Sequence, residues 1–428
     1  MRWALLVLFA ALPLQWYVVP GPGVAGQRLH LVVLVLFAIL VLVRFRGSAF
    51  VPVLSLTWSF VLANVALVMV WCATAFYNSE SVRSPLEEGI LIVVFLAVAT
   101  AIYRGCTDPA SGVVQYARWA AAAATVSLLL ALASSLALNG VNPATAFGRM
   151  LATGDTRILG HAVFKSAFAG FGFDATTARA NMRHEAFGAV LVAMFVSMTA
   201  VRLHPLSSGW SRTAYRASMV LGTLLILMSL SRSVTIAAAA IPLLAVVRTL
   251  RSGRLSTRQI ALAGAMAAGA AVLVVLGVST ILWDRFTQDT SSYQARDVLL
   301  HQAVTNIGEH ALTGGVSTVG ASSHNLVLDS WLRSGLFGAA FAAFILLLVV
   351  GVWLLLVIGL PREPGWMFPV TAALALPVIR MLTAGGGLIP PVEWVCLAVV
   401  AGFLRYRFDP GRQGAWHAPR ELSSTTPR

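Results

Sequence analysis

Long runs of apolar residues, separated by short polar breaks, make up most of the chain. A helix needs about 20 such residues to cross a bilayer, and the runs have roughly that length. The pattern predicts an all-α polytopic membrane protein with about twelve transmembrane helices in one domain over residues 1–408. The predicted spans lie near residues 3–19, 29–43, 50–76, 88–103, 117–138, 184–201, 212–231, 232–250, 259–283, 335–359, 367–383 and 388–404.

One interruption decides the direction of every later span. The apolar run over residues 212–250 is broken at residues 229–233, which read Ser-Leu-Ser-Arg-Ser. A single long helix here would put the arginine cluster of residues 248–258 and the arginine-rich tail outside the cell. Because cytoplasmic loops normally carry the excess of Arg and Lys, we predict two helices with Arg232 at an outer apex.

Composition and charge agree with this topology. Hydrophobic residues make up 58% of the 428 residues and charged residues 11%, whereas soluble proteins carry about twice that charge. With the N-terminus inside, the inner segments hold 18 of the 30 cationic residues and 4 of the 16 acidic residues. Both termini are therefore predicted to be cytoplasmic. The net charge of +14 then reflects orientation in the membrane, and it gives no argument for a nucleic-acid partner.

Two predicted extracytoplasmic segments, residues 139–183 and 284–334, are longer than ordinary connections. Long loops in a compact protein are usually functional. Residues 409–428 are rich in Pro, Ser, Thr, Gly and Arg, and we predict a disordered cytoplasmic tail there.

The second long segment contains a predicted short helix over residues 295–307, in which Leu299, Ala303 and Ile307 recur at helical spacing. Arg296 projects from the start of that helix, where its guanidinium can form a fork to a phosphate or carboxylate. The alternative is that Arg296 pairs with Asp297, with another acid or with a lipid headgroup.

A second candidate follows a flexible turn at residues 313–316. Ser322 or Ser323 is the predicted N-cap of the next helix, which would put His324 in its first turn. The positive end of a helix keeps imidazole neutral, as a general base requires. A lone histidine near a helix start is otherwise a surface residue. Arg232 adds a third candidate, because an arginine between two apolar helices must be solvated, paired or functional.

These elements together resemble the O-antigen ligase and O-antigen polymerase family. The resemblance rests on the Leu-Ser-Arg-Ser break at residues 230–233, the Arg296 helix leading to Gly314-Gly315, and Ser-His-Asn-Leu at residues 323–326 followed by Arg-Ser-Gly-Leu-Phe-Gly at residues 333–338. It covers roughly residues 178–348. The turn departs from the family's pattern, because Ala311 stands where proline is common and Gly-Gly replaces Gly-x-Gly.

The resemblance implies a metal-independent, inverting glycosyltransferase without a cofactor, in the cytoplasmic membrane and with its site on the extracytoplasmic side. The donor would be a glycan on a polyprenyl diphosphate and the acceptor a glycan or glycolipid hydroxyl. Arg232 and Arg296 would hold the donor diphosphate, and His324 would deprotonate or orient the acceptor. Polymerase and ligase are not separated by these residues; we lean to polymerase.

The first long segment carries cations and phenylalanines that suit either a donor site or a membrane surface. Arg179 and Arg183 would assist the diphosphate in the first case and meet lipid headgroups in the second. Among other charges, Glu185 is predicted to pair with an outer arginine. Arg380 and Glu393 are predicted to pair with each other, and Glu88 to suit a helix N-terminus.

Three other functions stay open. A secondary transporter also commonly has twelve spans, although transporters usually show repeated halves. A metal-dependent polyprenyl-phosphate-sugar glycosyltransferase would carry acids in its first outer loop, and residues 20–28 contain none. The third is a non-catalytic component of envelope polysaccharide export.

Overall fold

The computed structural model describes residues 1–14, 18–21, 24–45, 55–108, 112–138, 142–153, 182–229, 231–252, 291–315, 323, 325–383 and 389–409. Within these residues the chain is helical apart from one two-stranded hairpin. The helices are α1 (Arg2–Ala11), α2 (Leu29–Phe45), α3 (Ser55–Tyr77), α4 (Arg83–Thr107), α5 (Val113–Ala117), α6 (Ala120–Leu138), α7 (Pro143–Thr153), α9 (Met182–Leu203), α10 (Gly209–Met228), α11 (Arg232–Ser252), α14 (Ser291–Glu309), α15 (Leu326–Gly359), α16 (Met367–Ala373), α17 (Ala375–Thr383) and α18 (Pro391–Arg407).

Five of these helices are long and apolar enough to cross a membrane: α3, α4, α9, α11 and α15. Shorter apolar helices lie at four further predicted spans, within residues 2–11, 29–45, 120–133 and 367–383. The predicted helical membrane class is therefore confirmed for the described part of the chain. The number twelve and the direction of insertion stay predictions, and the predicted span at 259–283 and the tail beyond residue 409 lie outside the described residues.

Two predicted spans have a different structure. The span at residues 3–19 is wrong, because α1 ends at Ala11 and an antiparallel hairpin follows, with β1 (Val18–Gly21) paired to β2 (Val24–Arg28). Pro13 lacks an N–H and ends the helix, and valines favour strands. The span at residues 367–383 is divided into α16 and α17 at Leu374, where Pro377 cannot donate the next helical hydrogen bond.

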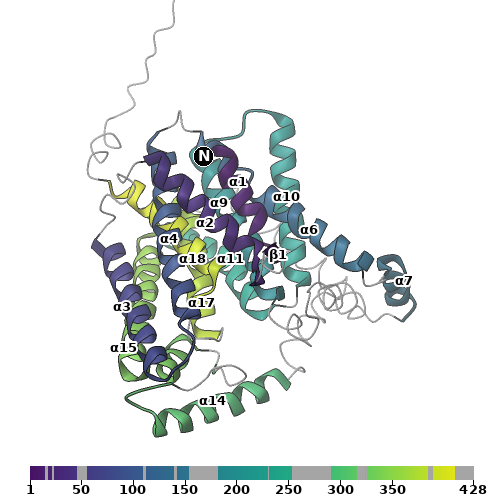
Figure 1. Ribbon diagram of the computed structural model, residues 1–428. Helices are drawn as coiled ribbons and strands as arrows, with labels where there is room; N and C mark the ends of the chain where they lie inside the picture. The colour runs from purple at the N-terminus through teal and green to yellow at the C-terminus, as the bar shows by residue number, and fades with distance from the viewer. Residues whose placement is uncertain are drawn as a thin grey trace, which may run out of the picture.

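The bundle packs around α9 and around the pair formed by α4 and α18 (Figure 1). Gly402 of α18 lies so close to α4 that an added Cβ would come within 2.7 Å of the Ala99 carbonyl oxygen. The rings of Phe60, Phe95 and Trp394 meet between α3, α4 and α18, with centroids 5.2 to 5.8 Å apart. The core thus joins elements from both ends of the sequence.

The two ends of the bundle differ in chemistry. Helix α14 lies across one of them, which we call the α14 end (Figure 1). At the other, which we call the arginine end, guanidinium groups reach backbone carbonyl oxygens: Arg202 to Gly365 at 2.8 Å, Arg248 to Glu363 at 3.3 Å, Arg251 to Ile358 at 3.4 Å and Arg118 to Pro205 at 3.1 Å. Arginine near the carbonyl-rich end of a helix is electrostatically favourable.

The arginine end also fixes how α10 and α11 run. Arg202, which contacts the Gly365 carbonyl at the arginine end, lies seven residues before the start of α10 at Gly209. Arg248, which contacts the Glu363 carbonyl at the same end, lies in the last two turns of α11. Helix α10 therefore starts and α11 finishes at the same end of the bundle. The chain therefore reverses direction between the end of α10 at Met228 and the start of α11 at Arg232, and the predicted pair of helices is confirmed as a structural feature.

A labelling experiment tests whether the arginine end is cytoplasmic. Cysteine at Ser252, the last residue of α11, is expected to react with a membrane-impermeant maleimide only after cells are opened. Cysteine at exposed Glu309, the last residue of α14, is expected to react in intact cells. The wild-type chain is the control, because Cys106 and Cys396 are buried and Cys72 is half-buried. Labelling of Ser252→Cys in intact cells would overturn the predicted orientation.

Candidate functional site

The break between α10 and α11 is built by serines. The Ser229 hydroxyl donates to the Ile226 carbonyl at 2.6 Å and accepts from the Ser231 N–H at 3.1 Å. The Ser231 hydroxyl in turn accepts from the Val234 N–H at 3.4 Å, as an N-cap does. Arg232 is the first residue of α11, and its side chain is half-buried. The predicted position of Arg232 at the helix reversal is therefore confirmed.

Two separate sets of side-chain hydrogen bonds fix the start of α15. The Asn325 side chain caps the helix by accepting from the N–H groups of Val327 at 2.9 Å and Leu328 at 3.3 Å. The carboxylate of Asp329, which is fully buried, accepts from both the N–H and the hydroxyl of Ser323 at 2.7 Å. The prediction that Ser322 or Ser323 is the N-cap is wrong, because the amide of Asn325 sits nearer the first free N–H groups.

His324 itself lies outside the described residues. Its neighbours on both sides are described, and each is tied to the first two turns of α15. Because α15 begins at Leu326, the sequence position of His324 precedes the N-cap and is not in the first helical turn. The argument that the helix end keeps this imidazole neutral is weakened accordingly.

A glycine turn joins α14 to a kink in α15. Gly314 and Gly315 have φ of +64° and +85°, and within α15 Gly335 has φ of +66° and ψ of −162°. The Arg333 carbonyl, two residues before Gly335, accepts from the Gly315 N–H at 3.1 Å. The Trp331 indole N–H donates to the Ala311 carbonyl at 2.8 Å. We call these contacts the glycine latch.

Helix α14 is longer than predicted, since it begins at Ser291 rather than at residue 295. Asp297 is therefore beyond the first turn, and its exposed carboxylate lies 3.8 Å from Nε2 of His301, one turn later. Position 296 is seven residues before Ala303, which is fully buried, so both positions share a face of α14. The side chain of Arg296 lies outside the described part.

The remaining predicted arginines are described only in part. Arg183 belongs to the first turn of α9, whereas its side chain and the whole of Arg179 lie outside the described residues. Between them and α6 lies α7, where Phe147, Arg149 and Leu151 are exposed. The predicted choice between a donor site and a membrane-surface element stays open for this segment.

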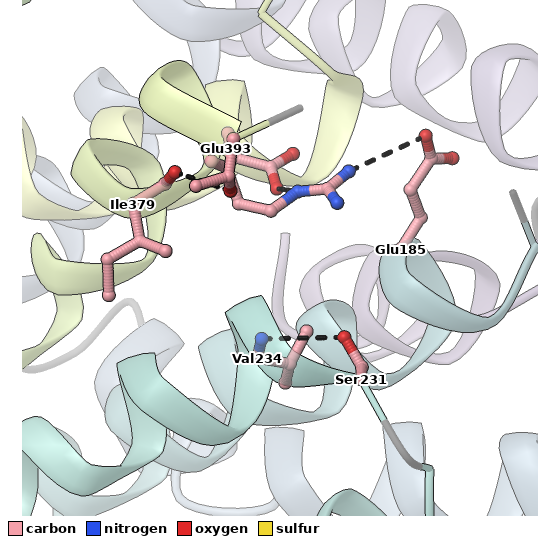
Figure 2. A network of polar contacts seen from close by, with 7 residues as sticks. Glu185, Ser231, Val234, Ile379 and Glu393 are labelled. Carbon is pink, nitrogen blue, oxygen red and sulfur yellow. Dashed lines mark hydrogen bonds and ion pairs between the residues drawn. The ribbon is translucent and has the colours of Figure 1, made fainter. Parts of the chain in front are cut away.

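Behind these positions, buried charged groups connect the helices near the α14 end. Arg380 of α17 donates from Nε to Oε1 of Glu393 in α18 at 2.8 Å, and its other side lies 3.9 Å from Oε1 of Glu185 in α9. Figure 2 shows this guanidinium between the two carboxylates, above the Ser231 cap. The predicted pairing of Arg380 with Glu393 is confirmed, and Glu185 also pairs with an arginine, Arg380; that this arginine lies on the outer side stays a prediction. We call Glu185, Arg380 and Glu393 the acid–arginine triad.

Glu88 belongs to a second buried contact. Its carboxylate accepts from the Trp394 indole N–H at 2.8 Å. The prediction that Glu88 begins a helix is wrong, because α4 begins at Arg83 and Glu88 is past the first turn and buried. Arg333 of α15 lies with its guanidinium 4.8 Å from the ring centre of Trp71, and Glu88 and Asp329 are among the acids around it.

Sequence reasoning missed the roles of Asp329 and Arg333. Both were assigned to an outer loop, although they are four residues apart, the spacing that aligns side chains on one helix face. That spacing within Leu-Asp-Ser-Trp-Leu-Arg was the available signal.

The described elements that carry the candidates share one end of the bundle. The glycine latch ties α14 to the first turns of α15, and α11, which begins at Arg232, packs against α9 and α17, which carry Glu185 and Arg380 of the acid–arginine triad. Three features are therefore present at this end: a helix that begins with Arg232, the buried acid–arginine triad, and a segment in which the residues before and after His324 are both bonded to α15. Among the described residues, no group of three or more His, Cys, Asp or Glu side chains is arranged to hold a metal ion.

Comparison with known protein families and with curated proteins finds no match for this chain. The residues and the helical bundle that carries them are therefore the basis for any functional conclusion.

Proposed function

We propose that the protein is a metal-independent inverting glycosyltransferase of surface-polysaccharide assembly, similar to O-antigen polymerases and ligases. It would transfer a glycan from a polyprenyl diphosphate to a sugar hydroxyl on the outer face of the cytoplasmic membrane. The proposal rests on the observation that three elements lie at the same end of the bundle, the α14 end: the Arg232 helix start, α14, and the α15 start anchored by Ser323 and Asn325.

The chemistry follows from the residue types. The acceptor oxygen attacks the anomeric carbon and forms a new C–O bond, while the bond from that carbon to the diphosphate oxygen breaks and the diphosphate leaves with the electron pair. Arg232 and Arg296 neutralise the charge on the leaving group, with Arg183 or Arg179 assisting, because guanidinium binds phosphate oxygens in pairs. His324 takes the proton of the attacking hydroxyl.

The test is glycan transfer in proteoliposomes from a polyprenyl-diphosphate-linked donor without added metal. His324→Ala and Arg296→Ala are each expected to lower the transfer rate by about 10²-fold or more, because each removes a group that acts in the transition state. Arg216→Ala is the matched control, since Arg216 is exposed on α10, in its half nearer the arginine end.

Two results would contradict the proposal. Full activity of both His324→Ala and Arg296→Ala would remove these residues from the reaction, and strict dependence on a divalent metal would favour the metal-dependent class. A labelled glycan that crosses the membrane without becoming attached to an acceptor would instead identify a transporter.

A further inference from the structure

Three arginines gather around the turn over residues 358–365 at the arginine end. The guanidinium groups of Arg202, Arg248 and Arg251 each donate to a backbone carbonyl oxygen of this turn. Arg202 comes from α9, and the other two come from the last turns of α11. The carbonyl groups that bind Arg202 and Arg248 belong to residues only two positions apart. The turn therefore draws like charges from two helices together, and we call these three residues the arginine trio.

The arginine trio has no ion-pair partner among the described residues. A carbonyl oxygen carries only a partial charge, and none of the three guanidinium groups lies within ion-pair distance of a described carboxylate. The acid of the turn itself, Glu363, is bonded through its carboxylate to Arg407 at 2.8 Å. Arg248 is also close enough to Arg202 to repel it electrostatically. Like charges held this close favour the binding of an anion.

The arginine trio has donors left for such an anion. Each guanidinium carries five N–H groups, and hydrogen bonds to described residues engage one of them in each side chain. Arg202 and Arg251 are exposed, and Arg248 is half-buried. The remaining N–H groups can therefore bind a ligand from outside, and a guanidinium matches the oxygens of a phosphate in pairs.

The arginine trio lies at the boundary of the membrane-spanning segments. Arg202 is the next-to-last residue of the α9 span, and Arg251 is the last residue of the α11 span. Ile358, whose carbonyl oxygen binds Arg251, is next to last in the α15 span. Lipid headgroups lie at this depth, just outside the hydrocarbon core. An anion of the membrane surface is therefore within reach of all three side chains.

Exposed apolar side chains adjoin the arginine trio on two of these helices. On α11, Val246 is 49% and Leu250 74% exposed, and on α15, Leu355 is 69% and Ile358 63% exposed. All four lie within the last two turns of their spans. In a membrane such side chains contact hydrocarbon chains. A ligand that covers both surfaces must have an anionic head and an apolar body.

We propose that the arginine trio binds the phosphate of an anionic phospholipid, whose acyl chains lie along the exposed apolar side chains of α11 and α15. A free phosphate ion would use the guanidinium groups but not the apolar surface beside them. Basic sites between membrane helices bind lipid headgroups in this way. The phosphate would offset the repulsion between Arg202 and Arg248 and link α9 and α11 to the turn. The site lies at the end opposite α14 (Figure 1) and does not depend on the proposed transferase activity.

Lipid binding to the full-length protein in neutral detergent, measured by native mass spectrometry, tests the proposal. The probe is phosphatidylglycerol, which carries one negative charge. Phosphatidylcholine is the comparison, because it has the same phosphate but no net charge. The wild type is expected to bind phosphatidylglycerol more tightly, and this preference is expected to fall as the salt concentration is raised. Equal affinity for the two lipids would overturn the proposal.

A double variant locates the site. Arg202→Gln/Arg248→Gln is expected to lower the affinity for phosphatidylglycerol roughly 30-fold, because each basic residue near an anionic lipid contributes about a factor of five. The matched control is Arg212→Gln/Arg216→Gln, which removes two charges from exposed positions in the first half of α10 and is expected to bind as the wild type does. An equal loss in both double variants would show a general effect of charge and contradict the site.

A single variant keeps the test decisive if the double variant does not fold. Arg251 is exposed and its hydrogen bond is long, at 3.4 Å, so Arg251→Gln is expected to fold normally. Its affinity for phosphatidylglycerol is expected to fall about fivefold. Unchanged affinity in Arg251→Gln would overturn the site. Displacement of phosphatidylglycerol by an equal concentration of inorganic phosphate would overturn the lipid as its occupant.

Discussion

Replacement of Gly335 by alanine is expected to abolish most of the folded protein. With φ of +66° and ψ of −162°, Gly335 occupies a backbone region that is essentially restricted to glycine. An added Cβ would also overlap the carbonyl oxygen of Leu312 and come within 2.6 Å of its carbonyl carbon. The strain and the overlap together cost roughly 2–6 kcal/mol, because neither the kink nor the glycine latch can move without breaking the other.

The measurement is the amount of monodisperse protein on size-exclusion chromatography in detergent, followed by a thermal melt. Gly351→Ala is the matched control, because Gly351 lies on the same helix and an added Cβ there meets nothing within 4 Å. A normal yield and melting temperature for Gly335→Ala would show that the protein folds without the kink in α15 at residue 335. The latch would then have no structural importance.

Replacement of Asp329 by alanine is expected to lower the free energy of unfolding by roughly 3 kcal/mol or more. The carboxylate is fully buried and accepts two hydrogen bonds from Ser323 at 2.7 Å. Each hydrogen bond to a charged group contributes about 1.5–3 kcal/mol, and the N–H of Ser323 would be left without its acceptor. The segment that carries His324 would then lose its attachment to α15.

Conservative variants locate the cause of this effect. Asp329→Asn keeps an acceptor oxygen in the same place and is expected to lose less stability than Asp329→Ala. Ser323→Ala removes only the hydroxyl bond and is expected to have the smallest effect of the three. Apparent melting temperatures in detergent give the order, and an Asp329→Ala melting temperature equal to that of the wild type would contradict it.

Hydropathy and breaker residues predicted most of the helices but could not mark every boundary. The break at residues 229–231 was predictable, because two serines and an arginine interrupt an apolar run and then cap the next helix. The hairpin was not predicted, since its first two residues, 18 and 19, fell at the end of a predicted span and residues 20–28 were assigned to a loop. A helix before residue 335 was predicted, but the buried contacts that Asp329 and Arg333 make within it were not.

The candidate site was predictable in its residue types more than in its contacts. Local sequence placed Arg232 at a helix start, since the serines that build it are adjacent. The acid–arginine triad brings together positions about 200 residues apart, and only pairing by charge hinted at it. No local pattern could reveal that Gly335 is kinked to receive the latch, because the reason lies in the Leu312 carbonyl of another segment.

The arginine end has a consequence for the choice between two amino acids of equal charge. Of the 30 cationic residues, Lys165 is the single lysine. Orientation in a membrane would be served as well by lysine, but Arg202, Arg248 and Arg251 bind the carbonyl oxygens of a turn over residues 358–365. An ammonium group lacks the flat, extended fork that reaches these oxygens. Lysines at these three positions would preserve the orientation of the protein in the membrane, but the turn over residues 358–365 would lose its hydrogen bonds to α9 and α11.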